Sequence, residues 1–260
     1  MNIKNSIHEF FSFSNLLADE SAKITMKYFR KKIQIENKSD NSPVTIADKK
    51  TELKIREMIN DKFPKHGILA EEFDNQNIES DFLWVIDPID GTKSYIAGHK
   101  DFGTLISLLY NKEPLIGVID CPAHKERWFG VKDKITTLNE KNIKTSNKEK
   151  IEDCYITTSG LYFDDQEFKI SFDKLREKVK YCKFGGDCYM YGMLASGLID
   201  IVIEDTLKVH DYMALIPVIE GAGGVVTDRY GEKISLNSNG SFVASCSQNI
   251  HKQVLQILNS

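Results

Sequence analysis

Apolar residues recur at steps of three and four along residues 7–29, which is the spacing of one face of an α-helix. The polar residues 36–43 interrupt this pattern, and a second apolar stripe follows over residues 47–59. Pro64 ends the second stripe, because proline lacks the amide hydrogen that a helix interior requires. The pattern therefore predicts two amphipathic helices whose apolar faces cover a core.

Four short apolar runs follow the second predicted helix, and each has the length of a β-strand. They cover residues 83–86, 103–110, 115–121 and 126–131. The connections between them, such as the turn predicted at residues 111–114, are too short for parallel crossovers, which need about a dozen residues. The first half is therefore predicted to place helices against a meandering, largely antiparallel sheet.

The second half alternates predicted strands with predicted helices, which is typical of an α/β unit. Strands are expected at residues 154–158, 200–204, 224–228 and 242–246, and helices at 166–180, 189–198 and from Asp211 to the glycines at 221–224. The charged residues 132–152 have weak periodicity and mark the predicted boundary. We expect residues 1–150 and residues 151–260 to be the two halves of one compact unit.

The chain has 260 residues, of which 41% are hydrophobic and 28% charged, and these proportions predict a globular protein of one or two domains. Its 38 acidic and 34 basic residues give a net charge of −4, which disfavours nucleic acid as a partner. No signal peptide is recognisable, and no apolar stretch reaches the ~20 residues of a membrane span. We therefore expect a soluble, cytoplasmic protein with no membrane partner.

The segment from Trp84 to Thr92 carries the most informative chemistry. An apolar strand leads into Asp87 and Asp90, and Gly91 and Thr92 follow directly. Two carboxylates held close together repel each other unless a cation lies between them, and oxygen ligands suit hard divalent cations. Glycine lets the backbone approach an anion, so this loop is predicted to bind a metal ion and a phosphate group.

Further acidic residues have structural explanations when each is taken alone. Asp48 and Asp211 stand at predicted helix starts, where a carboxylate caps the first turn and meets the helix dipole. Glu71 and Glu72 could form a solvated surface pair. Together with the segment that holds Asp87, however, these residues favour a shared site.

The acidic segments resemble those of the magnesium-dependent inositol monophosphatase-like phosphatases. The matching segments are Ala70-Glu71-Glu72, Asp87 to Thr92, His210 to Gly224, and the residues from Ser42 to Asp48. They keep the family's order and spacing over residues 43–228. The resemblance implies an α/β (α+β) fold, a layered α-β-α-β-α sandwich with largely antiparallel and mixed sheets. It also implies a homodimer.

The resemblance implies that the first half carries most ligands for two or three Mg²⁺ ions, which are Glu71, Asp87, Asp90, Asp211 and the carbonyl group of Ile89. It implies that Glu71 and Thr92 activate a water molecule and that Asp48 orients the Thr92 hydroxyl. The resemblance thus implies direct hydrolysis with no covalent phosphoenzyme. Other phosphoryl-transfer chemistries have no support, because the chain lacks their DxD pair, cysteine loop and P-loop.

Within the family, the segments around residues 87–95, 115–130, 184–192 and 211–224 resemble the histidinol-phosphatase branch. The implied substrate is the small phosphate ester L-histidinol phosphate, an intermediate of histidine biosynthesis. Its contacts would come from Gly91, Thr92, Lys183, Gly186, Asp187, Glu204 and Asp211. A protonated amine calls for carboxylates beyond those spent on metal, which Asp187 and Glu204 could supply.

Several alternatives stay open at this stage. Asp187 could be a helix N-cap, and Glu204 could end a strand that faces water. Trp128 and Phe129 could belong to the core or wall the pocket, and the core is favoured for at least one of them. Inositol 1-phosphate and 3′-phosphoadenosine 5′-phosphate are alternative substrates. A regulatory, RNA-associated protein of the same fold is the alternative without catalysis.

The distal segment departs from the family pattern at His210, where most members carry tryptophan. The change bears on packing or on substrate choice more than on metal binding, since the adjacent ligand Asp211 is kept. His210 could act through that ligand or lie on the surface, and the surface is favoured. Pro217 is predicted to kink the helix that follows.

Overall fold

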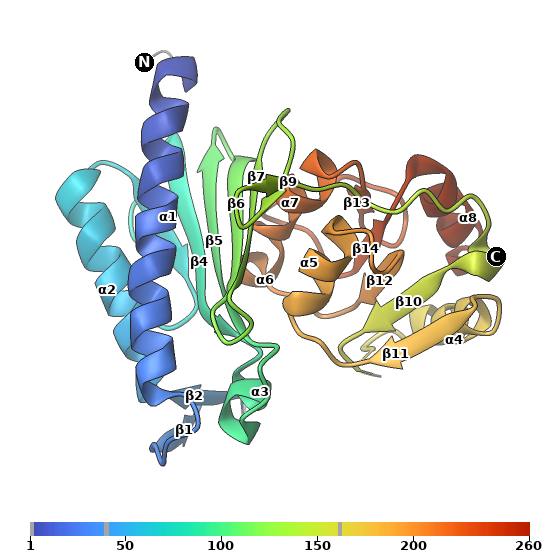
Figure 1. Cartoon of the computed structure of the whole chain (residues 1–260), viewed down its shortest axis with the longest axis horizontal. Coiled ribbons are helices and arrows are strands. Elements are labelled where there is room, and N and C mark those ends of the chain that lie inside the picture. Colours follow the sequence, from blue (N-terminus) through green and yellow to red (C-terminus); the bar gives the residue numbers. More distant parts are fainter. Residues whose placement is uncertain (1–2, 39–41, 161–162) are drawn as a thin grey trace.

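The computed structural model describes residues 3–38, 42–160 and 163–260, and it arranges them in alternating layers of helices and sheets (Figure 1). Two helices, α1 (Ile3–Tyr28) and α2 (Ile46–Lys62), cover one face of a seven-stranded sheet. A middle layer contains α5 (Tyr189–Ala195), α6 (Val209–Tyr212) and α7 (Leu215–Gly221). Beyond it lie a five-stranded sheet and then α4 (Gln166–Arg176) and α8 (Gln248–Leu258). The predicted α-β-α-β-α sandwich is confirmed.

The first sheet is antiparallel except at one edge. Its strands, in spatial order, are β3 (Gly67–Ala70), β4 (Phe82–Asp90), β5 (Gly103–Tyr110), β6 (Glu113–Cys121), β7 (Glu126–Val131), β8 (Thr137–Leu138) and β9 (Lys141–Asn142). Only β3 pairs in parallel, with β4. The turn before β6 is shorter than predicted, because Asn111 and Lys112 adopt φ angles of 49° and 68°, as a two-residue hairpin turn requires.

The second sheet is mixed, and it brings three strand ends to one edge. Its spatial order is β11 (Tyr181–Phe184), β10 (Tyr155–Thr158), β12 (Ile201–Glu204), β14 (Phe242–Ser245) and β13 (Val225–Thr227). The first three are parallel to one another, whereas β14 is antiparallel to both of its neighbours. Because parallel strands end at the same edge, Glu204 and the loops after β10 and β11 lie together.

Two stretches without strong periodicity contain strands. The segment predicted as a boundary, residues 132–152, includes β8 and β9, so the first sheet continues to Asn142. The polar residues 36–43 contribute to a small antiparallel sheet of β1 (Ile35–Asn37) and β2 (Pro43–Thr45), while residues 39–41 lie outside the described part. The helix predicted at 166–180 ends earlier, at Arg176, because β11 follows almost at once.

Glycines in the first sheet let the middle helices approach its backbone. A Cβ atom on Gly117 would lie 2.0 Å from the carbonyl oxygen of Ala214, and one on Gly130 would lie 2.4 Å from the carbonyl carbon of Pro217. Pro217 interrupts the predicted helix, but as a break and not a kink: the chain divides into α6 and α7, and Pro217 lies in the first turn of α7. The carbonyl of Met213, four residues earlier, accepts a hydrogen bond from Ser107 Oγ at 3.2 Å.

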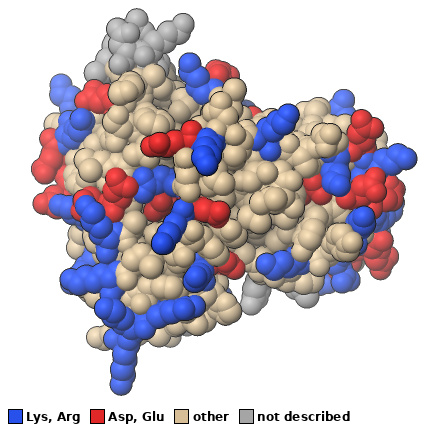
Figure 2. Space-filling view, viewed as in Figure 1, with Lys and Arg blue, Asp and Glu red and all other residues tan. Residues whose placement is uncertain are grey.

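The outer surface carries side chains of both signs (Figure 2). Basic side chains gather at the lower left of this view, over the C-terminal end of α1 and the β1–β2 sheet, where Lys27, Arg30 and Lys31 are exposed. Elsewhere on this face acidic and basic residues alternate. Among the described residues, no helix combines the length and the apolar composition that crossing a bilayer requires.

Candidate active site

The end of β4 carries two of the predicted metal ligands. Leu83 and Val85 face the middle helices, so the alternation of the strand turns Asp87 to the same side. Asp90, three residues on, would face the opposite side of a regular strand. A register shift between Asp87 and Asp90 breaks that alternation and allows both carboxylates to converge. The amide of Ile89 donates to Asp87 Oδ1 at 3.0 Å and fixes the first of them.

The four predicted acidic ligands form one cluster. Carboxylate oxygens of Asp87, Asp90 and Asp211 lie within 4.8 Å of one another, and so do the ligand atoms of Glu71, Asp87 and His210. Asp87 belongs to both groups, so the cluster offers two adjacent cation positions. Burial raises the pKa of Asp87 and of Asp90 well above the usual value, and the neighbouring carboxylates raise it further.

This donor set fits a hard divalent cation, because it is rich in mutually repelling carboxylate oxygen atoms, those of Asp87 buried and the others half-buried. The carbonyl oxygen of Ile89 lies in the same loop and accepts from Thr92 Oγ1 at 3.1 Å. An ammonium group already neutralises one end of the cluster: Lys38 Nζ lies 2.6 Å from Glu71 and 2.8 Å from Glu72. Burial disfavours the charge on Lys38, but these two hydrogen bonds raise its pKa overall.

Asp48 combines the two roles weighed for it. It is fully buried in the first turn of α2, where the amide of Thr45 donates to its Oδ2 atom at 2.8 Å and completes a capping box. Its other oxygen, Oδ1, lies 3.5 Å from Thr92 Oγ1. The helix cap is therefore present, and it holds the carboxylate beside the threonine that the family pattern connects to it.

A pocket beside the acidic cluster contains the two predicted amine-binding carboxylates. Its lining residues are Asp90, Ser159, Asp187, Met190, Tyr191, Glu204, Leu207 and Asp211. Glu204 is 5% exposed and accepts from Thr158 Oγ1 at 2.8 Å and from Ser159 Oγ at 2.5 Å. Burial raises the pKa of Glu204 to about 7. The alternative that Glu204 faces water is wrong.

Asp187 lies in the loop between β11 and α5, and its backbone has a φ of 41°. It does not cap α5, which begins at Tyr189 without a side-chain cap, so the N-cap alternative is wrong. Its side chain packs on Gly91, where an added Cβ would lie 2.7 Å from Asp187 Cγ. Gly186, buried with a φ of 129°, leads the chain into this position.

Three other candidates for the pocket lie away from it. Lys183 is exposed on the edge strand β11 and is not among the lining residues. Trp128 is fully buried beneath Gly192 of α5, and its indole nitrogen donates to Ser196 Oγ at 2.9 Å. Phe129 packs on the α1 side of the sheet. Both aromatic residues therefore belong to the core, which had been expected for at least one of them.

His210 corrects an expectation. The surface position favoured from the sequence is wrong, because His210 is 9% exposed and lies with Glu71 and Asp87. Tyr191 was not predicted at all: it lines the pocket, it is 3% exposed, and its buried hydroxyl has no hydrogen-bond partner within the described residues. In the sequence, Tyr191 looks like an ordinary core residue of an apolar helix, so no signal marked it.

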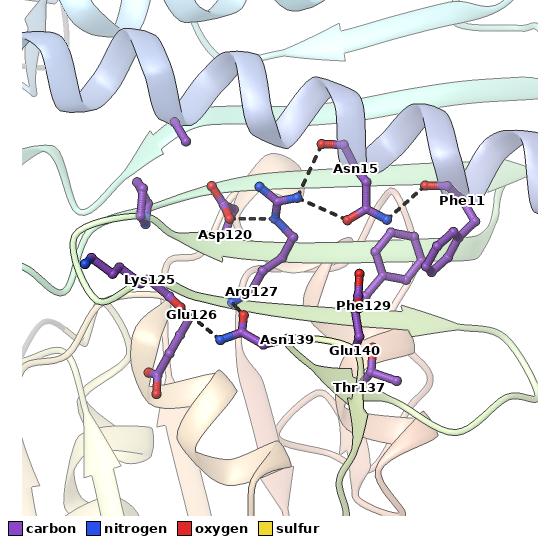
Figure 3. Close-up of a pocket in the computed structure, with 12 residues that line it drawn as sticks. Phe11, Asn15, Asp120, Lys125, Glu126, Arg127, Phe129, Thr137, Asn139 and Glu140 are labelled. Carbon is purple, nitrogen blue, oxygen red and sulfur yellow. Dashed lines mark hydrogen bonds and ion pairs between the residues drawn. The ribbon is translucent and has the colours of Figure 1, made fainter.

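A separate, larger pocket of about 520 Å³ lies between α1 and the strands β6, β7 and β8 (Figure 3). Arg127 points across it, and its Nε donates to Asp120 Oδ1 at 2.7 Å while one terminal nitrogen lies 3.1 Å from Asn15 Oδ1. No member of the acidic cluster lines this pocket. The guanidinium group instead ties α1 to the sheet that it covers.

Comparison with known proteins agrees with this arrangement. The sequence profile of the inositol monophosphatase family matches residues 6–260. The chain belongs to this family. Its members are metal-dependent phosphatases that act on small phosphate esters, so the buried acidic cluster has the composition that the family's chemistry requires.

Relatives within the family carry more than one activity in their names. The chain is 42% identical to the bifunctional phosphatase IMPL2, chloroplastic, of Arabidopsis thaliana, over 97% of this chain and 75% of that protein. It is 33% identical to a histidinol-phosphatase of Chlorobaculum parvum, over 86% and 87% of the two chains. The structure of an inositol monophosphatase from Zymomonas mobilis superposes with a TM-score of 0.89 at 36% identity, covering 97% and 98%.

Proposed function

We propose that this phosphatase hydrolyses L-histidinol phosphate to L-histidinol and phosphate, with Mg²⁺ as cofactor, in the cytoplasm. One observation carries the proposal: two carboxylates outside the metal cluster, the half-buried Asp187 and the buried Glu204, line the same pocket as Asp90 and Asp211. Neither forms a salt bridge within the described part of the chain, so a cation from the substrate could pair with them. The histidinol-phosphatase of Chlorobaculum parvum, which is 33% identical to this chain, supports this choice.

The residues divide the work between metal, water and substrate. Glu71, Asp87, Asp90, Asp211 and the Ile89 carbonyl would hold Mg²⁺. Bound Mg²⁺ would lower the pKa of a water molecule and neutralise charge on the phosphoryl group. Glu71 accepts a proton from the attacking water, Thr92 Oγ1 orients that water, and Asp48 fixes the Thr92 hydroxyl. Asp187 and Glu204 bind the substrate ammonium group, which orients the ester over the metal ligands.

A substrate panel tests the proposal. Purified protein with Mg²⁺ should release phosphate from L-histidinol phosphate with a kcat/KM about tenfold or more above that for inositol 1-phosphate or 3′-phosphoadenosine 5′-phosphate. Removal of Mg²⁺ with a chelator should abolish release from every ester. Faster hydrolysis of inositol 1-phosphate, the substrate class named for the similar Zymomonas structure, would contradict the assignment.

Replacing Glu71 with glutamine separates catalysis from folding. Glu71→Gln should lower kcat by about 10³-fold or more, because the variant lacks both a metal ligand and the proton acceptor. Its circular dichroism spectrum should match that of the wild type. If the folded wild-type protein hydrolyses none of the esters, the RNA-associated alternative is favoured instead. A measurement of RNA binding at the basic side chains near the C-terminal end of α1 would then test that alternative.

A further inference from the structure

We propose that the imidazole of His210 is itself a metal ligand, so that the cation position it shares with Glu71 and Asp87 prefers Mn²⁺ over Mg²⁺. The inference deepens the metal site of the proposed function, but it does not depend on which ester is the substrate. It concerns a residue that the family's usual ligand pattern does not include, since tryptophan is typical at this position.

The geometry brings three ligand atoms from three elements to one point. A ring nitrogen of His210, an oxygen of Glu71 and an oxygen of Asp87 all lie within 4.8 Å of one another. Two ligand atoms that bind one ion at about 2.0–2.2 Å lie closer together than this limit. The three side chains would therefore rotate toward one another to bind the ion. Glu71 follows β3, Asp87 lies in β4 and His210 in α6, which packs on β4.

Burial and the lack of a short hydrogen bond to Asp211 favour His210 as a ligand at this position. The His210 side chain is 10% exposed, and its Nε2 atom lies 3.5 Å from Asp211 Oδ1, too far for a good hydrogen bond. At the same end of the cluster, Lys38 Nζ contacts Glu71 Oε1 at 2.6 Å, so a metal ion bound there would share Glu71 with this ammonium group or leave it paired with Glu72 alone. Adjacent residues of α6 thus serve adjacent positions, with His210 beside Glu71 and Asp211 beside Asp90.

Ligand chemistry sets the expected selectivity. Carboxylate and carbonyl oxygens suit Mg²⁺ and Mn²⁺ alike, whereas an imidazole nitrogen is a ligand of transition metals, of which Mn²⁺ binds least tightly, and rarely of Mg²⁺, so this nitrogen separates the two ions. A site with two carboxylates and one imidazole should therefore favour Mn²⁺. Tryptophan at residue 210 offers no lone pair for coordination, so the preference belongs to this chain's histidine.

Direct spectroscopy on the full chain tests the ligand. Protein stripped of metal and loaded with Mn²⁺ should show nitrogen modulation in its electron spin-echo spectrum, and labelling histidine with ¹⁵N should change that modulation. His210→Gln should remove the signal, while His8→Gln, which alters an exposed histidine of α1, should keep it. A wild-type spectrum without nitrogen coupling would overturn the proposal, and it does so even if the His210 variant fails to fold.

Calorimetry of the same proteins tests selectivity. His210→Gln and His210→Trp should weaken Mn²⁺ binding about tenfold or more and leave Mg²⁺ binding within about threefold. An unchanged ratio of Mn²⁺ to Mg²⁺ affinity would overturn the proposal. Both experiments omit phosphate esters, so failure of the histidinol phosphate assignment leaves their outcome unaffected, and the reverse also holds.

Discussion

At the level of single residues, Gly91 affects both the stability of its loop and the position of Asp187 in the pocket. Its φ of 78° lies in the left-handed region, and an added Cβ would meet Asp187 Cγ at 2.7 Å. Gly91→Ala should therefore lower the free energy of unfolding by about 1–2 kcal/mol from strain alone and also displace Asp187. Chemical denaturation and the KM for L-histidinol phosphate measure the two effects, and KM should rise.

Gly185 is the matched control, because it has a φ of 92° but no atom within 4 Å of its added Cβ. Gly185→Ala should show a comparable loss of stability with KM unchanged. Equal effects of both variants on KM would mean that the contact between Gly91 and Asp187 has no role in binding.

Glu204 makes substrate binding depend on pH. Burial raises its pKa to about 7, so the carboxyl is neutral below that pH and charged above it. Only the charged form attracts an ammonium group, so the ratio of the KM of Glu204→Gln to that of wild type should increase from near pH 6 to near pH 8, reaching about tenfold. Comparing two proteins on one substrate cancels the titration of the substrate itself.

Inositol 1-phosphate has no ammonium group and serves as the control ester. For this ester the KM ratio between Glu204→Gln and wild type should stay constant with pH. A constant ratio for L-histidinol phosphate as well would exclude Glu204 as the partner of the amine.

The acidic metal ligands could be predicted from the sequence, whereas other residues that surround them in the site could not. Asp87 and Asp90 stand in a segment whose order of residue types is itself informative. Lys38 and Tyr191 carry no such signal, because one lies in a polar stretch and the other in an apolar helix. Their place at the site depends on tertiary contacts between distant segments. His210 was noticed, but only its burial shows that it belongs to the cluster.

At the level of elements, the contact between β6 and the chain around α7 positions Asp211. Gly117→Ala would place a methyl group 2.0 Å from the Ala214 carbonyl oxygen, so the segment that carries Asp211 must move away from β4. We expect Mg²⁺ affinity, measured by calorimetry, to fall about tenfold or more, together with a loss of stability of about 1–3 kcal/mol.

Val118→Ala is the control, because it creates a cavity of similar cost on the opposite face of the same strand. This variant should lose stability and keep its Mg²⁺ affinity. If both variants bind Mg²⁺ as tightly as the wild type, the packing of α7 on β6 does not determine the metal site.

Strong periodicity decided which elements were predicted. The strands β5 and β7 agree with prediction residue by residue, since each is a short apolar run between turns. β11 is largely exposed at a sheet edge and shows no alternation, and β8 has only two residues, so pairing with neighbours defines both. The helix α8 does carry a local signal in the sequence, since Ser247 caps it and its buried apolar residues recur every four positions.

At the level of the whole molecule, the site draws on three layers. The first sheet supplies Asp87 and Asp90, the middle layer supplies Asp211, and the second sheet supplies Glu204. Each carboxylate in this group has a raised pKa caused chiefly by burial. Negative charge is thus concentrated where the layers meet. Burial of these carboxylates and the repulsion between them lower the free energy of unfolding until a cation binds.

The stability of the metal-free protein should therefore fall as pH rises. A carboxyl whose pKa is higher in the folded state stabilises the fold while protonated, and this contribution disappears as pH increases from about 4.5 through the folded pKa. For Glu72 and Glu204 the folded pKa is about 7, so the loss should be largely complete near pH 8. With a chelator present, Tm should be about 5 °C or more lower near pH 8 than near pH 5.5.

Added Mg²⁺ should offset part of this loss, because it binds the ionised ligand carboxylates, such as those of Asp87 and Asp90, in the folded state only, and not Glu72 or Glu204. The rise in Tm on adding Mg²⁺ should be larger near pH 8 than near pH 5.5, where protons compete for the same oxygens. Asp87→Asn provides the control, since it removes the carboxylate common to both cation positions: Tm near pH 8 should rise in chelator and no longer respond to Mg²⁺. A metal-free Tm that increases with pH would show that the buried carboxylates do not oppose folding, and the electrostatic account of the site would then be wrong.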